Sequence, residues 1–472
     1  MRKTKIVCTI GPASESKEML EKLVMAGMNV ARLNFSHGSH EEHATRIKNI
    51  RQVSEALNKP IAIMLDTKGP EFRIKTFKNG KVSLKAGDEF IFTSKDIEGD
   101  EKSVAVNFEG LCNDVKPGDH ILVCNGLMDF EVKDIDGEDV HCITITDGEL
   151  SNRKSMNFPG KVMSQEYLSD TDKADILFGI EQEVDFIACS FVSRKQDLLD
   201  VKKFLEEHNA PDIELIAKIE NQPGIDNIDE ICQECSGIMI GRGDMGVEIP
   251  AEKLPAVQKS LITRCRLLGK RVITATEMLE SMITSPRPTR AEVSDVANAV
   301  YDGTSAVMLS GETAAGKYPE QAVKMMASIA ESTENSIHYE KRFYNYEFEM
   351  KNNVDCISHA VCGMAIDVKA KAIAVCSISG ITVRMVSRFR CPVDILGITT
   401  DLRSYRKLAL SWGVTPVLCE RFDSTEVLFY YAQKTAKEMF DLKPGDNCVI
   451  TGGMVNGVSG NTNLIKVATI AD

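Results

Sequence analysis

The sequence predicts an α/β fold: a (β/α)8 TIM barrel that is interrupted by a β-rich lid domain and followed by a C-terminal α/β domain. Three observations lead to this prediction. Eight short apolar runs rich in Val and Ile lie within residues 5–311, and helical patterns separate most of them. The rhythm breaks once, over residues 71–160, where hairpin patterns replace it. A second α/β pattern starts after about residue 336.

The eight barrel strands are expected where a short apolar run ends in a loop signal. Helices are expected near residues 16–26, 39–57 and 169–181. Another should begin at Pro319, since proline suits the first turn of a helix. Eight strands joined in this way favour a closed barrel over the alternative, an open doubly wound sheet. The expected strands are residues 5–10, 28–35, 61–66, 184–191, 214–220, 237–242, 271–276 and 306–311.

The lid and the C-terminal domain have patterns of their own. Turn pairs such as Asp136-Gly137 and Asp147-Gly148 separate alternating segments and are typical of β-hairpins. Later strands are expected within residues 372–470. We expect a barrel domain at residues 1–69 and 161–340, a lid domain at 70–160, and a C-terminal domain at 341–472.

Composition limits the class of function. The chain has 472 residues, 43% hydrophobic and 26% charged, which is ordinary for a globular protein. Its net charge of −13 argues against a nucleic-acid binder, which needs a basic face, but leaves room for a small anionic substrate in a local positive pocket. No apolar run suits a signal peptide or a membrane span, and the 14 cysteines are expected to be reduced thiols, so we expect a cytoplasmic protein.

Charged side chains follow the expected barrel strands at their carboxyl ends, where such barrels carry their chemistry. Lys218 and Glu220 have the same parity on one strand, so both should point into the barrel mouth. Glu220 and Asp244 form an oxygen-rich pair that suits Mg²⁺ or Mn²⁺. With Arg32 and Lys218 beside that metal, the set fits phosphoryl transfer, in which charge on the phosphoryl oxygens must be neutralised. For any single residue, an ordinary ion pair remains the alternative.

Several long motifs of the chain resemble those of a known family. They include TKIVCTIGPAS, NVARLNFSHG, LDTKGPEFR, IAKIEN, GRGDMGVEIP, VITATEMLESM and MLSGETAAGKYP. On these motifs the chain closely resembles the pyruvate kinase family over essentially its full length. The resemblance implies a glycolytic phosphotransferase that moves the phosphoryl group of phosphoenolpyruvate to ADP, giving pyruvate and ATP. It also implies Mg²⁺ (or Mn²⁺) and K⁺ as cofactors, a homotetramer, and a regulatory C-terminal domain that binds a sugar-phosphate or AMP effector.

The resemblance also assigns roles to residues of this chain by position. It makes Lys218, Arg32 and Thr276 catalytic, and these three contact the substrate together with Gly243 and Asp244. Glu220 and Asp244 are the implied ligands of the divalent metal. The other implied sets are Asn34, His37, Arg73 and Lys154 for the nucleotide; Asn34, Ser36, Asp66 and Thr67 for K⁺; and Ser377, Ser379, Gly380 and Thr382 for the effector, over which the glycine-rich residues 457–461 would close.

The chain departs from the family pattern in ways that bear on the site. Gly241 stands where Ala is usual, and Cys124 and Asn125 replace an acidic pair in the lid. Ser155 follows Lys154 where Gly is usual. Two other functions stay open: a metal-dependent lyase, which needs neither a nucleotide nor the lid, and a non-catalytic sensor of phosphoenolpyruvate or nucleotide.

The sequence generates a prediction about potassium. Residue 71 is Glu, at a family position that holds either Glu or Lys, and a glutamate cannot supply the positive charge that balances the bound phosphates. We therefore expect K⁺ to activate the enzyme more than Li⁺ does, and Glu71→Lys to reduce the K⁺ requirement while lowering the maximal rate. The measurement is activity with Mg²⁺ in a tetramethylammonium buffer, titrated with KCl at constant ionic strength. Full activity without K⁺ would contradict the prediction.

Overall fold

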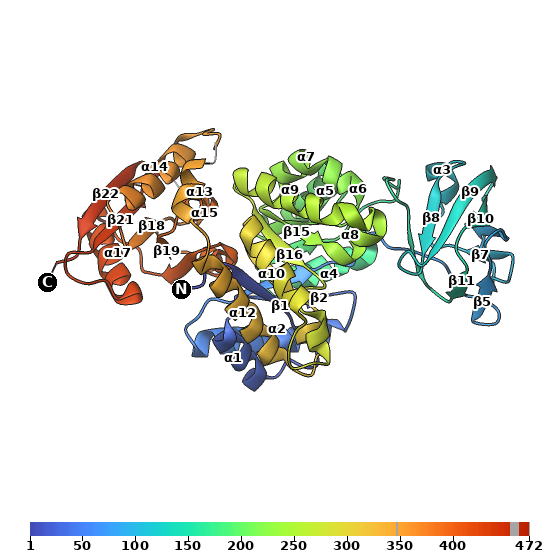
Figure 1. The fold of residues 1–472 in the computed structure, drawn as a ribbon, viewed down its shortest axis with the longest axis horizontal. Coiled ribbons are helices and arrows are strands. Elements are labelled where there is room, and N and C mark those ends of the chain that lie inside the picture. Colours follow the sequence, from blue (N-terminus) through green and yellow to red (C-terminus); the bar gives the residue numbers. More distant parts are fainter. Residues whose placement is uncertain (346–347, 454–461, 472) are drawn as a thin grey trace.

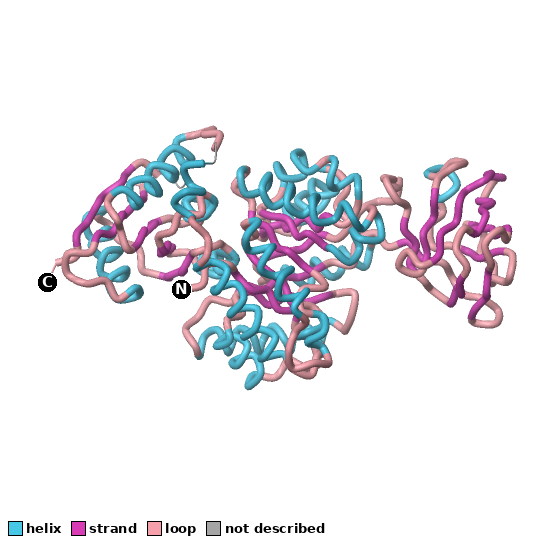
Figure 2. The backbone as a smooth tube through the Cα atoms, viewed as in Figure 1, coloured by secondary structure: helices cyan, strands magenta, loops and turns pink. Residues whose placement is uncertain are grey.

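The computed structural model describes residues 1–345, 348–453 and 462–471. The barrel lies in the middle of an elongated molecule, with the lid at one end and the C-terminal domain at the other (Figure 1). Helices surround the strands of the barrel, whereas the lid consists mainly of strands and loops (Figure 2). Among the helices of these ranges, none combines the length and the apolar character that crossing a membrane requires.

Eight parallel strands close into a barrel in the order β1-β17-β16-β15-β14-β13-β3-β2, which confirms the predicted fold class. All eight predicted runs form these strands, and an open sheet is excluded. The strands are β1 (Lys5–Thr9), β2 (Val30–Asn34), β3 (Ala62–Asp66), β13 (Phe186–Cys189), β14 (Glu214–Ile219), β15 (Gly237–Gly241), β16 (Arg271–Ala275) and β17 (Ala306–Leu309).

The alternation of side chains along β14 explains how charges reach the barrel mouth. Ile216 packs inside the barrel with apolar residues of the other strands, while Leu215 and Ala217 face the outer helices. Side chains alternate across a strand, so Lys218 shares the inward parity of Ile216. The same parity continues to Glu220, directly after the strand. The inward row therefore changes from apolar to charged at the carboxyl end.

Two of the barrel helices begin at capping boxes. Ser39 and Glu42 form a capping box at the start of α2, and Thr289 and Glu292 form another at the start of α10. Pro319 opens α12 as predicted. The helices are α1 (Lys17–Ala26), α2 (His40–Ala56), α4 (Asp170–Glu181), α5 (Lys195–Glu207), α6 (Gln222–Asp226), α7 (Ile228–Glu234), α8 (Arg242–Glu248), α9 (Leu254–Leu267), α10 (Arg290–Asp302), α11 (Gly311–Ala314) and α12 (Pro319–Asn335).

The lid has a hydrophobic core of its own, in which Phe90, Phe92 and Phe130 are fully buried. Its strands form one seven-stranded and one two-stranded sheet. The chain enters the lid after β3 and leaves it before α4, so two crossing segments connect it to the barrel. The elements are β4 (Phe72–Arg73), β5 (Lys81–Leu84), β6 (Glu89–Thr93), β7 (Ser103–Ala105), α3 (Leu111–Asp114), β8 (His120–Val123), β9 (Met128–Asp136), β10 (Asp139–Thr144), β11 (Gly148–Ser151) and β12 (Ser155–Asn157).

The C-terminal domain is a five-stranded sheet in the order β20-β19-β18-β21-β22. The edge strand β22 runs antiparallel to β21, whereas the other pairs are parallel. The elements are α13 (Tyr339–Asn345), α14 (Asn353–Asp367), β18 (Ala372–Cys376), α15 (Ile381–Arg388), β19 (Asp394–Thr399), α16 (Leu402–Lys407), β20 (Val414–Leu418), α17 (Thr425–Phe440), β21 (Asn447–Gly452) and β22 (Leu464–Thr469).

An ion cluster joins the amino-terminal end of the barrel to the C-terminal domain. Glu214, at the start of β14, pairs with Arg271 of β16 at 2.5 Å. Arg384 of α15 and Lys407 of α16 approach the same carboxylate at 3.6 and 3.8 Å. Burial raises the pKa of Glu214, but these three cations outweigh it and bring the pKa down to about 2. The carboxylate therefore stays ionised and stabilises the junction.

Glu214→Gln should destabilise the protein, because it leaves three clustered cations without their carboxylate. We expect a loss of about 2 kcal/mol, less than for a fully buried pair, since the Glu214 side chain is 20% exposed. The folded pKa lies below the ordinary value of 4.5, so this stabilisation is complete above pH 4.5 and disappears as the pH falls toward about 2.

The measurement is the urea midpoint of both proteins at neutral and at acid pH. The matched control is Glu207→Gln, which removes an exposed pair with Lys203 and should change the midpoint much less. A difference between wild type and Glu214→Gln that persists undiminished at the acid end would contradict the assigned role of the carboxylate.

Candidate active site

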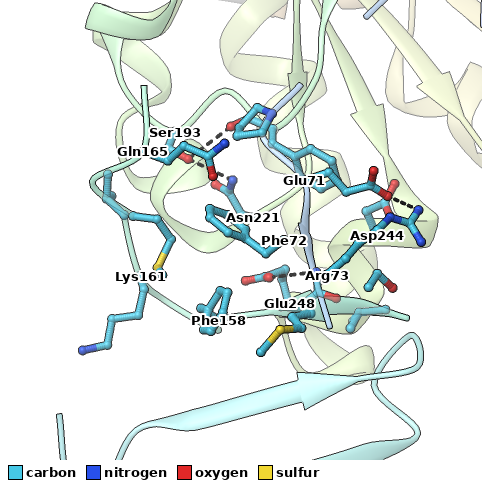
Figure 3. Close-up of a pocket in the computed structure, with 18 of the residues that line it drawn as sticks. Glu71, Phe72, Arg73, Phe158, Lys161, Gln165, Ser193, Asn221, Asp244 and Glu248 are labelled. Atoms are coloured by element: carbon cyan, nitrogen blue, oxygen red, sulfur yellow. Dashed lines mark hydrogen bonds and ion pairs between the residues drawn. The ribbon is translucent and has the colours of Figure 1, made fainter. Parts of the chain in front are cut away.

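A cavity of about 580 Å³ lies between the lid and the carboxyl ends of the barrel strands (Figure 3). The lid side contributes the two crossing segments, including Arg73 and Phe158, and the lid loop residue Asn125. The barrel side contributes α8 with Asp244 and other strand-end residues. The cavity therefore lies where parallel barrels carry their chemistry.

Lys218 is the centre of a buried polar network at the barrel mouth. Its ammonium donates to Ser190 Oγ at 2.6 Å and to Asp66 Oδ1 at 3.0 Å, and it lies 3.1 Å from Glu220 Oε1. Burial lowers the pKa of Lys218, but the carboxylates of Asp66 and Glu220 outweigh it, and the net shift is upward. The lysine is therefore a fixed positive charge at neutral pH.

Asp66 holds a second cation beside the first. Arg32 Nε donates to Asp66 Oδ2 at 2.6 Å, and Arg32 Nη1 donates to Thr9 Oγ1 at 3.0 Å. Burial raises the pKa of Asp66, but Arg32 and Lys218 reverse this, and the pKa lies below its usual value. One ionised carboxylate thus keeps two cations adjacent, although they would otherwise repel each other.

Glu220 and Asp244 fit a divalent cation. Glu220 is buried and accepts a hydrogen bond from the Phe191 backbone at 2.9 Å, while Asp244 faces the cavity. Burial raises the pKa of Glu220 to about 7, and the negative charge of Asp244 adds to the rise although Lys218 opposes it. Two carboxylates with excess negative charge are suitable ligands for Mg²⁺ or Mn²⁺. No cluster of three or more His, Cys, Asp or Glu ligands occurs within the described residues, so water or substrate oxygens would complete the coordination.

Gly241 gives Glu220 the space for its present conformation. A Cβ at position 241 would lie 2.6 Å from Glu220 Oε1, the oxygen that faces Lys218. The backbone of Gly241 has φ −87°, which any residue can adopt. The missing side chain, rather than backbone freedom, is what allows the pairing of Glu220 with Lys218.

Thr276 and Gly243 form a second part of the site. The Gly243 amide donates to Thr276 Oγ1 at 2.8 Å, and Thr276 has the unusual φ of 65°. Arg242 holds this turn, because its guanidinium donates to the Thr276 carbonyl at 2.5 Å and pairs with Asp295 at 2.7 Å. Sequence reasoning placed Arg242 at a strand end but gave it no role.

The structure brings together Arg32, Asp66, Lys218 and Glu220 in one network. Sequence reasoning placed Ser190 at the end of a strand but gave it no role; its hydroxyl donates to the Thr67 carbonyl at 2.6 Å and accepts from Lys218. The available signal was a serine directly after the strand that became β13. The Ser190 hydroxyl accepts from the Lys218 ammonium and thereby helps to fix its direction.

The residues predicted for K⁺ lie together, since Asn34 and Asp66 are register partners on β2 and β3, whereas those predicted for the nucleotide are more scattered. Asn34 Oδ1 accepts from the Ser36 amide at 3.1 Å, which orders this short turn. Of the four predicted nucleotide contacts, Arg73 lines the cavity and also pairs with Glu71. The other three, Asn34, His37 and Lys154, lie outside the cavity lining.

The predicted effector residues lie at the start of α15. Gly380 has φ 71° and precedes the helix, and the buried Thr382 hydroxyl makes a 2.6 Å hydrogen bond with Thr462. Ser379 lines a separate cavity of about 440 Å³ between the barrel and the C-terminal domain, and Ser377 donates its amide to Ile398. Residues 457–461, predicted to close over this loop, lie outside the described residues.

Two family models match the chain, one for the pyruvate kinase barrel domain over residues 1–323 and one for the pyruvate kinase alpha/beta domain over residues 355–468. The chain belongs to the pyruvate kinase family. Its activity is that of the family, in which phosphoenolpyruvate and ADP give pyruvate and ATP.

Individual relatives agree with this assignment. Pyruvate kinases of Staphylococcus epidermidis and Staphylococcus aureus are 50% identical over 475 aligned residues, which cover 100% of this chain and 81% of each relative. The crystal structure of a pyruvate kinase from Cryptosporidium parvum has a TM-score of 0.94 at 37% identity and covers 99% of this chain and 96% of that one. The similarity therefore includes the barrel, the lid and the C-terminal domain.

Gly241→Ala should strengthen binding of a divalent metal. The new Cβ would exclude the Glu220 conformation that pairs with Lys218, so the carboxylate would lose a partner that competes with the metal. We expect Mn²⁺ to bind about 3- to 10-fold more tightly, the equivalent of about 1 kcal/mol for one ion pair. Mn²⁺ titration followed by electron paramagnetic resonance measures the affinity.

Gly246→Ala is the matched control, since a Cβ there meets no atom within 4 Å. It should leave the Mn²⁺ affinity unchanged. Unchanged or weaker Mn²⁺ binding by Gly241→Ala would show that the Lys218–Glu220 pair does not compete with the metal.

Proposed function

We propose that the buried network around Lys218 carries the phosphoryl transfer. The observation that supports this most strongly is the pair of fixed cations, Lys218 and Arg32, held side by side by Asp66. A transferring phosphoryl group carries negative charge on its oxygens and passes through a loose transition state. Preorganised cations stabilise that charge without reorganising during the reaction. Lys218 therefore serves the phosphoryl group in transit, and Arg32 contacts that group from β2.

Glu220 and Asp244 are the proposed ligands of Mg²⁺ or Mn²⁺. When bound, the metal supplies positive charge to the phosphoryl oxygens and to the enolate oxygen of pyruvate. The protein's own contribution is the position of the two carboxylates, one buried and one facing the cavity. The pairing of Glu220 with Lys218 supports this assignment, because the ammonium opposes the rise in the pKa of Glu220 that burial causes and favours the charged form that a metal requires.

Thr276, Gly243 and Asp244 are the proposed cradle for the carboxylate of phosphoenolpyruvate. The Gly243 amide donates to Thr276 Oγ1 at 2.8 Å, so the two groups lie next to each other, and an incoming carboxylate would replace this hydrogen bond. After phosphoryl transfer, the enolate carbon must accept a proton, and we place this step beside Thr276. The lid would exclude water that could otherwise hydrolyse the phosphoryl donor.

The remaining assignments rest on the family. We propose K⁺ at Asn34, Ser36, Asp66 and Thr67, and ADP at Asn34, His37, Arg73 and Lys154. We also propose a cytoplasmic homotetramer whose loop at Ser377, Ser379, Gly380 and Thr382 binds a sugar phosphate or AMP. Support for the tetramer comes from the exposed apolar residues Val427, Tyr430 and Val467 on the edge strand and helix of the C-terminal domain. Support for the effector loop comes from the cavity at Ser379.

A coupled assay of pyruvate formation tests the function. The proposed activity requires pyruvate to form from phosphoenolpyruvate only when ADP is present. A metal-dependent lyase would act without ADP, and a sensor would bind phosphoenolpyruvate without turnover. Pyruvate release that does not depend on ADP would overturn the proposal.

Lys218→Met should lower kcat by at least about 100-fold, because the cation acts on the transition state more than on bound substrate. The KM for phosphoenolpyruvate should change much less. Steady-state kinetics with purified protein measures both. Asp244→Asn is the comparison variant, which should instead weaken Mn²⁺ binding in a titration. A large KM increase with near-normal kcat in Lys218→Met would reject the assigned role.

A further inference from the structure

Helix α8 carries two carboxylates one turn apart, and both line the cavity between the barrel and the lid. Asp244, in the first turn, belongs to the proposed metal site. Glu248, the last residue of α8, lies four positions later, so both side chains share one face of the helix. Both line the large cavity together with Arg73 and Phe158 (Figure 3). Glu248 belongs to neither the proposed metal site nor the proposed nucleotide site.

Glu248 contacts the segment by which the chain leaves the lid. Asn157 Nδ2 donates to Glu248 Oε1 at 3.2 Å, and the Phe158 backbone N–H is a second donor to this carboxylate. Asn157 is the last residue of β12, and Phe158 belongs to the lid core, where its ring packs edge-on against Phe72 at 5.3 Å. Phe72 lies on the segment by which the chain enters the lid. Glu248 therefore holds the point at which both crossing segments meet.

A second contact joins α8 to the lid. The loop residue Gly126 approaches Val247 so closely that a Cβ at position 126 would lie 3.1 Å from Val247 Cγ1. Gly126 has φ 79°, a conformation that favours glycine. Val247 and Glu248 are neighbours, so the end of α8 meets the lid at two places.

We propose that Glu248 is a positioning residue that couples the divalent-metal site to the position of the lid, with α8 transmitting the coupling. This rests on the proposed metal site at Glu220 and Asp244. Helix α8 has seven residues and follows β15 without a loop, so its first and last turns move together. A metal that fixes Asp244 therefore also fixes the carboxylate that holds Asn157. Metal binding would in this way order the lid before the nucleotide is held.

The charge around Glu248 agrees with this role. Burial raises the pKa of Glu248 to about 7, although the hydrogen bonds from Asn157 and Phe158 lower it, and the charge of Asp244 raises it further. Neutralising Asp244 with a divalent ion would remove this repulsion and strengthen the ionised carboxylate as an acceptor. A partly buried carboxylate that only packed against the lid would gain nothing from its place beside the metal.

The other crossing segment provides a matched control. There the Gly69 amide donates to Asp172 Oδ1 at 3.0 Å, and Asp172 lies in the first turn of α4. This anchor also holds the lid, but it comes from a helix without a proposed metal ligand. Asp172→Ala and Glu248→Ala thus remove acceptors of the same chemical kind, only one of which lies on the metal helix.

Hydrogen–deuterium exchange of residues 155–158, with and without Mn²⁺, tests the coupling, and Mn²⁺ binding is followed separately by electron paramagnetic resonance. In the wild type, Mn²⁺ should slow this exchange about 5-fold or more, the usual size of coupling between two sites. Glu248→Ala should abolish the slowing, whereas Glu248→Gln, which keeps an acceptor for Asn157, should retain part of it. Asp172→Ala should respond to Mn²⁺ as the wild type does. The KM for ADP should rise in Glu248→Ala.

The outcomes separate this proposal from the one on which it rests. If Mn²⁺ binds and slows exchange equally in wild type and Glu248→Ala, or changes exchange in neither, the coupling is wrong while the metal site stands. If Mn²⁺ does not bind to the wild type, the metal site and the coupling are both wrong. Should Glu248→Ala fail to fold, Glu248→Gln and Asn157→Ala decide: a full Mn²⁺ response in both overturns the proposal.

Discussion

The active site depends on the carboxylate of Asp66, which holds Arg32 and Lys218 together inside the protein. Two cations in a region of low dielectric repel each other, and without a shared partner they would separate or lose a proton. With Glu220 and Asp244, the mouth carries two cations and three carboxylates, so negative charge is in excess by one. A divalent ion would change this excess into a positive one, which is what an incoming phosphoryl group requires.

The barrel can hold these charges because side chains alternate along each strand, and every second one points inward. The inner row of β14 is apolar at Ile216 and charged at Lys218, so the polar residues lie at the edge of the core rather than within it. Lys218 then finds partners on other strands: Ser190 just after the adjacent β13, and Asp66 on β3, one strand further along. The lid adds a cover whose hydrophobic core is separate from that of the barrel.

Much of the fold could be predicted, because strong local signals agree with the tertiary arrangement. Val- and Ile-rich runs predicted all eight barrel strands, and Pro319 marked a helix start. Lys218, near the end of β14, and Glu220, directly after it, were named from the sequence, and both lie in the buried network at the barrel mouth. Ser190 was placed at a strand end without a role and Glu248 was missed, because a serine after a strand and a glutamate at a helix end are common. Their roles come from partners 28 and 91 residues away in the chain.

The sequence by itself determined the order of strands and helices, the inward parity of Lys218 and Glu220, and the oxygen-rich chemistry of the mouth, since all of these depend on residue type and local spacing. Only the tertiary structure decided which charges pair. Asp66 meets Lys218 across 152 residues of chain, and Gly241 leaves room for the Glu220 conformation beside that lysine. Ion pairing depends on distance, and residues so far apart in the chain come close only when the barrel closes.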